Sequence, residues 1–459
     1  HLISSLNTAQ VQALTTDQLT ELVAAQISYL KTEQIASLKG AQIAAIEVAD
    51  LQEFSSDQIV ALNSVQIASL KIDQVKGLSS EQVAAIESID IKGLSTLQMQ
   101  ALNSEQVSAL DANQLSSMTD LQVAAIGTTG DDAGIHGLKP EQIQVLDKAQ
   151  ISALKTDQIA ALDNDQIKSL DVNQISYLND NQIKALNVDQ IANLEAFQVE
   201  AFSAKQVALF SATQVAALTD EHIATLGSDQ IKALLPNQIG AMAGHQLQAL
   251  SVDQFANLGT GQIAALKVSQ VQALTDEQVA SLTLNTTSGG KTVSGQLAAL
   301  STLQVAALSS EQLTALTGDQ VKALSTKQLV AIQVSEITGI DSADLQGLNS
   351  SQIGALTTVQ IKALSAEQLA AFGTAPTGDA ADQPSQIESL TTAQVAALSA
   401  EQWAGMTTGQ VADITTAQLV AIKTDVISSL SSEQIHALTE TQVKALTVTQ
   451  ISKMTGEQV

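Results

Sequence analysis

The residues with the clearest potential for chemistry are the aspartates of two segments rich in Gly and Asp, 127–137 and 373–385. Carboxylate oxygens are ligands that Ca²⁺ prefers, and the chain has a formal net charge of −27. Neither segment has the spacing of an EF-hand loop or of a glycine-rich nonapeptide. The sequence therefore predicts weak calcium binding at these aspartates, and no other cofactor is expected. They are Asp131, Asp132, Asp379 and Asp382.

Pairs of acids three residues apart are a second candidate for metal binding. Such paired carboxylates can hold a cation. They can equally be solvated groups at the N-terminal ends of helices, where the helix dipole favours negative charge, and we prefer this second interpretation. The pairs are Glu47 with Asp50, Glu87 with Asp90, and Asp341 with Asp344.

Residues for covalent or acid-base catalysis are not grouped in the sequence. The chain has no Cys, and its five His residues are scattered without the spacing of a metal site. No G-x-S-x-G motif and no phosphate-binding loop is present. We therefore predict that the protein is not an enzyme.

The basic residues and the apolar segments indicate whether the protein binds nucleic acid or enters a membrane. All 20 basic residues are Lys, whereas phosphate recognition depends on basic patches and on Arg, so a nucleic acid partner is not expected. No apolar run approaches the roughly 18 residues that span a bilayer, so membrane insertion is not expected either.

Glutamine recurs every eight residues, beginning with Gln10, Gln18, Gln26 and Gln34. We number each octad from its Leu. Positions 2 and 3 are mostly Ser, Thr, Asn, Asp or Lys, position 4 is often acidic, position 5 is Gln, position 6 is Ile, Val or Leu, and positions 7 and 8 are small or Lys. The repeated Gln could be an exposed amide ladder for a partner. We prefer a structural role, either as a contact that caps a helix or as an internal ladder between successive units.

The eight-residue period predicts which secondary-structure elements position these residues. In a continuous helix, at about 100° per residue, the position of the Leu would rotate around the helix axis by roughly 80° per octad. No neighbouring element could stay packed against such a rotating row of Leu. A short helix in every octad explains four features: the S/T-x-x-Q capping box, Pro140 and Pro236 at the first helical position, acids in the first turn and Lys in the last turn. The sequence therefore predicts an all-α solenoid of short capped helices, one per octad. A β-solenoid is the alternative, because Thr is abundant and positions 6 and 8 alternate.

Three interruptions divide the array into blocks and are predicted to be surface loops. The predicted blocks are 1–126, 138–282, 296–372 and 386–459, and the loops are 127–137, 283–295 and 373–385. Because the octad resumes unchanged after each loop, we treat the loops as decorations and not as domain boundaries. Neither end of the chain resembles a polar capping unit, so we expect it to belong to a longer array or to an end-to-end assembly. Trp403, at position 6, is predicted to lie in the core.

Two resemblances add to this interpretation. The segment 274–282, which reads L-T-D-E-Q-V-A-S-L, resembles the first helix of a TAL-effector repeat. The second helix and the base-reading loop of that repeat have no counterpart here, so DNA binding is not implied. Over nearly its whole length, the L-[ST]-x-x-Q-[IV]-x-A pattern resembles the octad arrays of very large secreted or surface proteins of bacteria. This resemblance implies an extracellular or cell-surface location.

These observations together favour a non-catalytic structural repeat protein. We expect a segment or subunit of an extracellular filament, surface fibre or adhesin stalk that associates with itself. A solenoid scaffold that binds a protein or glycan partner is the alternative.

Overall fold

The computed structural model describes residues 2–374 and 384–459, and its contacts divide the chain into two units, His1–Leu226 and Gly227–Val459. The boundary between them lies inside the octad block 138–282.

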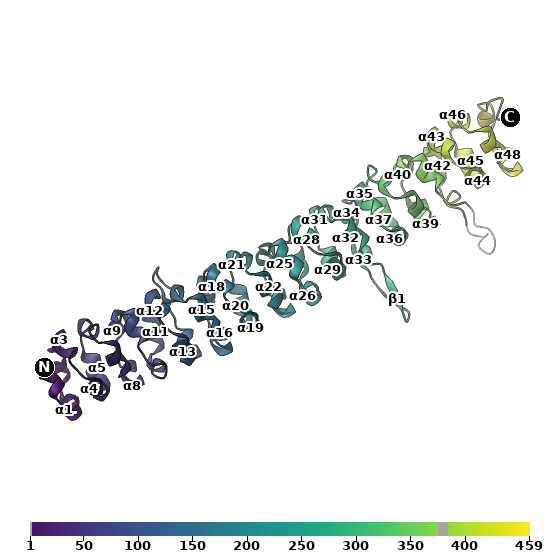
Figure 1. The fold of residues 1–459 in the computed structure, drawn as a ribbon. Helices are drawn as coiled ribbons and strands as arrows, with labels where there is room; N and C mark the ends of the chain where they lie inside the picture. The colour runs from purple at the N-terminus through teal and green to yellow at the C-terminus, as the bar shows by residue number, and fades with distance from the viewer. Residues whose placement is uncertain (1, 375–383) are drawn as a thin grey trace. The chain divides into compact units, whose positions relative to one another are not determined.

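Both units are built mainly from one short helix per octad (Figure 1), whereas the described octads of Gln386 and Gln458 form turns. Each α-helix begins at position 3 in the regular octads and contains four to six residues, as in α4 (Thr32–Ser37) and α8 (Ser64–Ala68). Four octads instead form 3₁₀ helices, and one two-stranded sheet is present among the described residues. These elements are η1 (Ile3–Ser5), η2 (Ile91–Gly93), η3 (Gly134–Gly137), η4 (Ile337–Gly339), β1 (Thr286–Ser288) and β2 (Lys291–Val293). The predicted all-α solenoid is confirmed, and the β-solenoid alternative is wrong.

The helix starts follow the predicted capping pattern. At α8, the side chain of Asn63 accepts a hydrogen bond from the Gln66 N–H, and Gln66 Oε1 accepts one from the Asn63 N–H at 3.0 Å. Where position 2 is Lys, as at Lys31, only the second of these bonds forms. Pro140 and Pro236 each occupy the first helical position, of α15 (Pro140–Gln144) and α27 (Pro236–Ile239), as predicted.

Each helix ends before position 1, where the backbone becomes extended. Leu38, after α4, has φ −60° and ψ 142°, and the extended Lys39 that follows it caps α5 (Gly40–Ala45). Two extended residues therefore turn the chain between successive helices. Position 6 and position 1 fill the core, since Ile35 is 0% exposed and Leu38 is 4% exposed. Trp403 replaces an aliphatic residue at position 6 and is 1% exposed, which confirms its predicted place in the core.

The octads coil so that one turn takes between three and four of them. Helix α1 (Thr8–Ala13) contacts α4, and α2 (Thr16–Thr20) contacts α5, which in both cases is three octads later. Hydrogen bonds from the side chain of the repeated Gln reach the unit four octads earlier, as from Gln66 to Ile35 and Leu38. Because each octad is too short to bury its apolar side chains alone, the core exists only between stacked turns.

The extra chain enters the octad at the same place in all three interruptions, between position 2 and position 5. Thr283 caps Gln296 across thirteen residues, because the Thr283 N–H donates to Gln296 Oε1 at 3.1 Å and Thr283 Oγ1 accepts from the Gln296 N–H at 3.0 Å. The Gly373 N–H likewise donates to Gln386 Oε1 at 2.7 Å. The capping contact is thus kept across the second and third inserts.

The inserts differ in their local structure. In the second, β1 and β2 form an antiparallel hairpin that stands away from the neighbouring helices (Figure 1), and the Gly295 N–H donates to Asn285 Oδ1 at 2.7 Å at its base. In the first, the last four residues form η3, and Ile135 at its position 6 is fully buried. Segment 127–137 therefore holds a complete core unit as well as a loop.

Candidate functional site

The repeated glutamine uses both ends of its amide inside the solenoid. Gln66 is 2% exposed, and its Oε1 accepts from the Asn63 N–H. Its Nε2 donates to the carbonyl oxygens of Ile35 at 2.8 Å and Leu38 at 2.7 Å, which lie 31 and 28 residues earlier. The amide therefore caps its own helix and links it to the unit four octads back. We name this repeated set of bonds the glutamine seam.

The seam keeps its partners across the inserts. After the first insert, Gln142 Nε2 donates to Val107 and Leu110, 35 and 32 residues earlier. After the second, Gln296 Nε2 donates to Phe255 and Leu258, 41 and 38 residues earlier. The separation grows by the length of the extra chain, so the partner is set by position in the octad. The structural role predicted for the Gln is confirmed, and the ladder joins units four apart instead of successive ones.

His222 replaces Gln in one octad and makes hydrogen bonds at both of its ring nitrogens, as the Gln amide does at both of its ends. Its Nδ1 accepts from the Thr219 N–H at 3.2 Å, and its Nε2 lies 2.8 Å from the carbonyl oxygen of Leu194, 28 residues earlier. The ring is 3% exposed. A neutral imidazole with its proton on Nε2 reproduces the acceptor and the donor of an amide.

Acidic residues and Val426 interrupt the seam, because none of them can donate as the amide does. Asp50, in α6 (Val48–Leu51), is 7% exposed, and its pKa is raised by burial and then by the charges of Glu47 and Glu53. Burial and Asp341 likewise raise the pKa of Asp344, in α38 (Ser342–Leu345). The paired acids thus lie near helix N-termini, as in the interpretation that we preferred, but Asp50 is buried and not solvated.

Replacing Asp50 by Gln is expected to stabilise the fold. The new amide supplies a donor toward the Leu19 and Leu22 carbonyls, and the gain is about 1 kcal/mol at neutral pH. The folded chain binds a proton at Asp50 more tightly than the unfolded chain does, so the cost of the carboxylate falls as pH drops through its raised pKa. The gain in stability should therefore be smaller near pH 4, which is about the pKa of an Asp carboxyl in an unfolded chain.

Urea unfolding of Asp50→Gln and the parent at both pH values measures this difference. Asp57→Asn, at an exposed acid in the first turn of α7 (Ser56–Val60), is the control and should change stability little. A gain for Asp50→Gln that is independent of pH would contradict the assigned cause.

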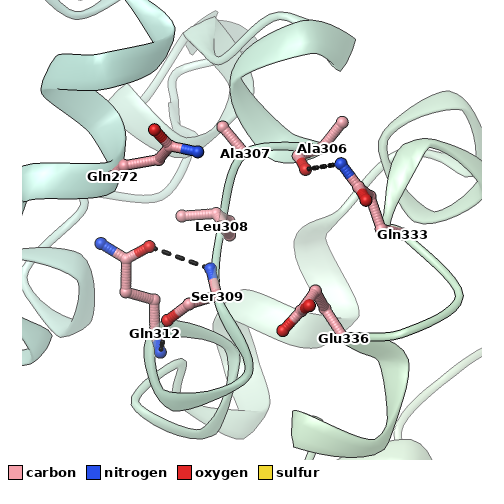
Figure 2. A pocket seen from close by; sticks show the side chains of 8 residues that line it. All are labelled: Gln272, Ala306, Ala307, Leu308, Ser309, Gln312, Gln333 and Glu336. Carbon is pink, nitrogen blue, oxygen red and sulfur yellow. Dashed lines mark hydrogen bonds between the residues drawn. The ribbon is translucent and has the colours of Figure 1, made fainter.

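Glu336 interrupts the seam differently. A Gln at this position would reach the Val305 and Leu308 carbonyls. Instead, the Glu336 carboxylate accepts from the Ser310 N–H at 2.8 Å, at the start of α35 (Ser310–Thr314), and from Ser335 Oγ at 2.9 Å. An opening of about 390 Å³ remains beside it (Figure 2). It is lined by Gln272, Ala306, Ala307, Leu308, Ser309, Gln312, Gln333 and Glu336.

The candidate calcium ligands are not gathered at one site in the part of the chain that is described. Asp131 and Asp132 are exposed, and the Asp132 carboxylate accepts from the Ser104 hydroxyl while its backbone carbonyl accepts from the Ser104 N–H. Asp132 therefore fastens the first insert to the start of α12 (Ser104–Ser108). Asp379 and Asp382 lie outside the described residues. Among residues 2–374 and 384–459, no group of three or more His, Asp or Glu side chains could hold a metal ion.

Three octads without Gln share a close backbone approach. The 3₁₀ helices η2, η3 and η4 end at Gly93, Gly137 and Gly339. A Cβ on these glycines would lie 2.2, 1.9 and 2.3 Å from the carbonyl oxygens of Ser64, Ser104 and Ser310, respectively. Only Gly fits this contact, and the sequence signal that could have identified it is a Gly at position 8 of an octad that lacks Gln.

The structural unit is thus a capped octad of the form A-L-T-T-x-Q, as at residues 355–360. Six segments of the chain match the ALTTAQ repeat. The ALTTAQ matches occur in both units, and the inserts lie outside them except at their edges. The matched residues are 43–80, 83–120, 159–196, 294–331, 337–374 and 411–448. No curated protein matches the chain. Among the described residues, no helix has the length and apolar character needed to cross a membrane.

Proposed function

We propose that the chain is a non-catalytic structural solenoid that serves as a segment or subunit of an extracellular filament, surface fibre or adhesin stalk. The observation that carries the proposal is the glutamine seam. The most regular polar side chain of the sequence is used for internal hydrogen bonds, and no buried side-chain nitrogen or oxygen among the described residues lacks a partner. The ALTTAQ matches support a repeat array, and the extracellular location follows from the resemblance to octad arrays of secreted and surface proteins.

Self-association is inferred from the repeat itself. Because every octad presents the same types of side chain, two copies can meet through equivalent surfaces along the array. A heterologous contact of this kind produces open filaments.

Electron microscopy and sedimentation of the purified chain over a range of concentrations test this proposal. We expect filaments whose length grows with concentration. Only dispersed monomers of the parent chain at high concentration would contradict the proposal.

A scaffold that binds a partner is the second candidate function. The opening at Glu336 favours it, because this opening places a carboxylate beside a break in the seam. Calcium binding by Asp131, Asp132, Asp379 and Asp382 stays a prediction.

A further inference from the structure

We propose that the opening at Glu336 binds an organic cation, either an ammonium or a guanidinium group. The inference rests on the second candidate function, to which it gives a ligand class. The filament proposal does not depend on it.

The opening arises from the exchange of an amide for a carboxylate. In a regular octad the Gln Nε2 occupies the space between two carbonyl oxygens, as Gln328 does at Leu297 and Leu300, at 2.9 and 3.0 Å. Glu336 has no N–H to donate, and its carboxylate is held by the Ser310 N–H instead. The space that an amide would fill is therefore open, and no hydrogen-bond donor of the described structure reaches the Leu308 carbonyl oxygen.

The groups around the opening are mainly acceptors. Each Glu336 carboxylate oxygen accepts one hydrogen bond and has the capacity for a second. Gln333 Nε2 donates one of its two N–H groups to the Ala306 carbonyl at 3.0 Å, and its Oε1 is an acceptor. Gln312 is committed at both ends, to the Ser309 N–H and to the seam. Figure 2 shows Glu336 across the opening from Gln272 and Gln312.

Charge and size select the ligand. No Lys or His is among the residues that line the opening, and the chain has a formal net charge of −27. A ligand with several N–H donors and a positive charge would satisfy both the Leu308 carbonyl and the carboxylate, and the planar guanidinium fork matches a carboxylate with two parallel bonds. A volume of about 390 Å³ suits a small molecule or one long side chain. Because the chain contains no Arg, a guanidinium must come from a free ligand or from a partner.

Isothermal titration with argininamide and with its uncharged analogue citrullinamide tests the proposal. We expect saturable binding of argininamide, and binding of citrullinamide weaker by roughly tenfold or more. Equal binding of the two compounds would overturn the proposal. Titration with a short Arg-containing peptide separates the sources. Tighter binding of the peptide than of argininamide indicates a partner side chain, and equal binding indicates a free small ligand.

Glu336→Gln is the decisive variant, because it removes the charge and places an amide into the opening. It should abolish argininamide binding while raising the melting temperature, so a loss of binding cannot be attributed to misfolding. Asp344→Gln, at the next octad, also restores a seam residue but lies outside the opening, and it should bind like the parent. Unchanged binding by Glu336→Gln would overturn the proposal. Sedimentation of the same variant reports separately on the filament.

Discussion

Gln182→Leu is expected to lower the free energy of local unfolding by about 3 to 5 kcal/mol, a very large effect for a single polar residue. Gln182 is 1% exposed, and its Nε2 donates to the Ile151 and Leu154 carbonyls at 2.7 and 2.8 Å. Its Oε1 accepts from the Asn179 N–H at 2.8 Å. Leucine fills a similar volume but leaves the Leu154 carbonyl and the Asn179 N–H without partners, and the Ile151 carbonyl keeps only the bond from the Leu154 N–H at 3.2 Å.

Native-state hydrogen exchange measures the loss, because opening of a repeat array is local and need not follow a two-state transition. The amides of residues 151–186 should exchange faster, while those several turns away change little. Gln18→Leu is the matched control. Gln18 Oε1 accepts from the Thr15 N–H at 2.9 Å, and its Nε2 makes no seam bond in the described structure, so only about 1 kcal/mol of capping is lost. Equal effects of the two variants would show that the cap, and not the seam, holds the turns together.

Gly137→Ala should destabilise the first unit by about 2 to 3 kcal/mol. The added Cβ would lie 1.9 Å from the Ser104 carbonyl oxygen, and this neighbour is backbone that cannot rotate away. The shift would also disturb the Asp132 contacts with Ser104, which fasten the first insert.

The control for this variant is Gly261→Ala, because a Cβ on Gly261 meets nothing within 4 Å. Gly261 lies inside α30 (Thr260–Ala264), so Ala should stabilise that helix by up to about 1 kcal/mol. Urea unfolding followed by circular dichroism should give opposite signs for the two variants. A destabilisation by both would mean that backbone freedom, and not close approach, explains the glycines.

The helices were predictable because their determinants lie within one octad. The capping box, Pro140 and Pro236 at the first helical position, and Trp403 in the core all depend on neighbours a few residues away. These short-range patterns specified where each helix begins, at which end its acidic and basic residues lie, and which side chains are buried.

The partners of the seam were not predictable, because they depend on how far the chain turns between helices. That angle is set by two extended residues such as Leu38 and Lys39, and nothing within an octad specifies a separation of 28 residues. The same limit explains Glu336. The sequence marks it as a substitution for Gln, but its reach to Ser310 and the opening beside it follow only from the stacking of turns. The pairing of Asp132 with Ser104 likewise depends on that stacking.

The common entry point of the inserts has a consequence for protein engineering. Between Thr283 and Gln296, a hairpin is accommodated without loss of either capping bond or of the seam bonds one turn back. The segment between position 2 and position 5 of an octad is thus a site for insertions, and it is free to vary in length and sequence. A foreign peptide grafted there would be displayed at a fixed place on the repeat, with the register of every other octad unchanged.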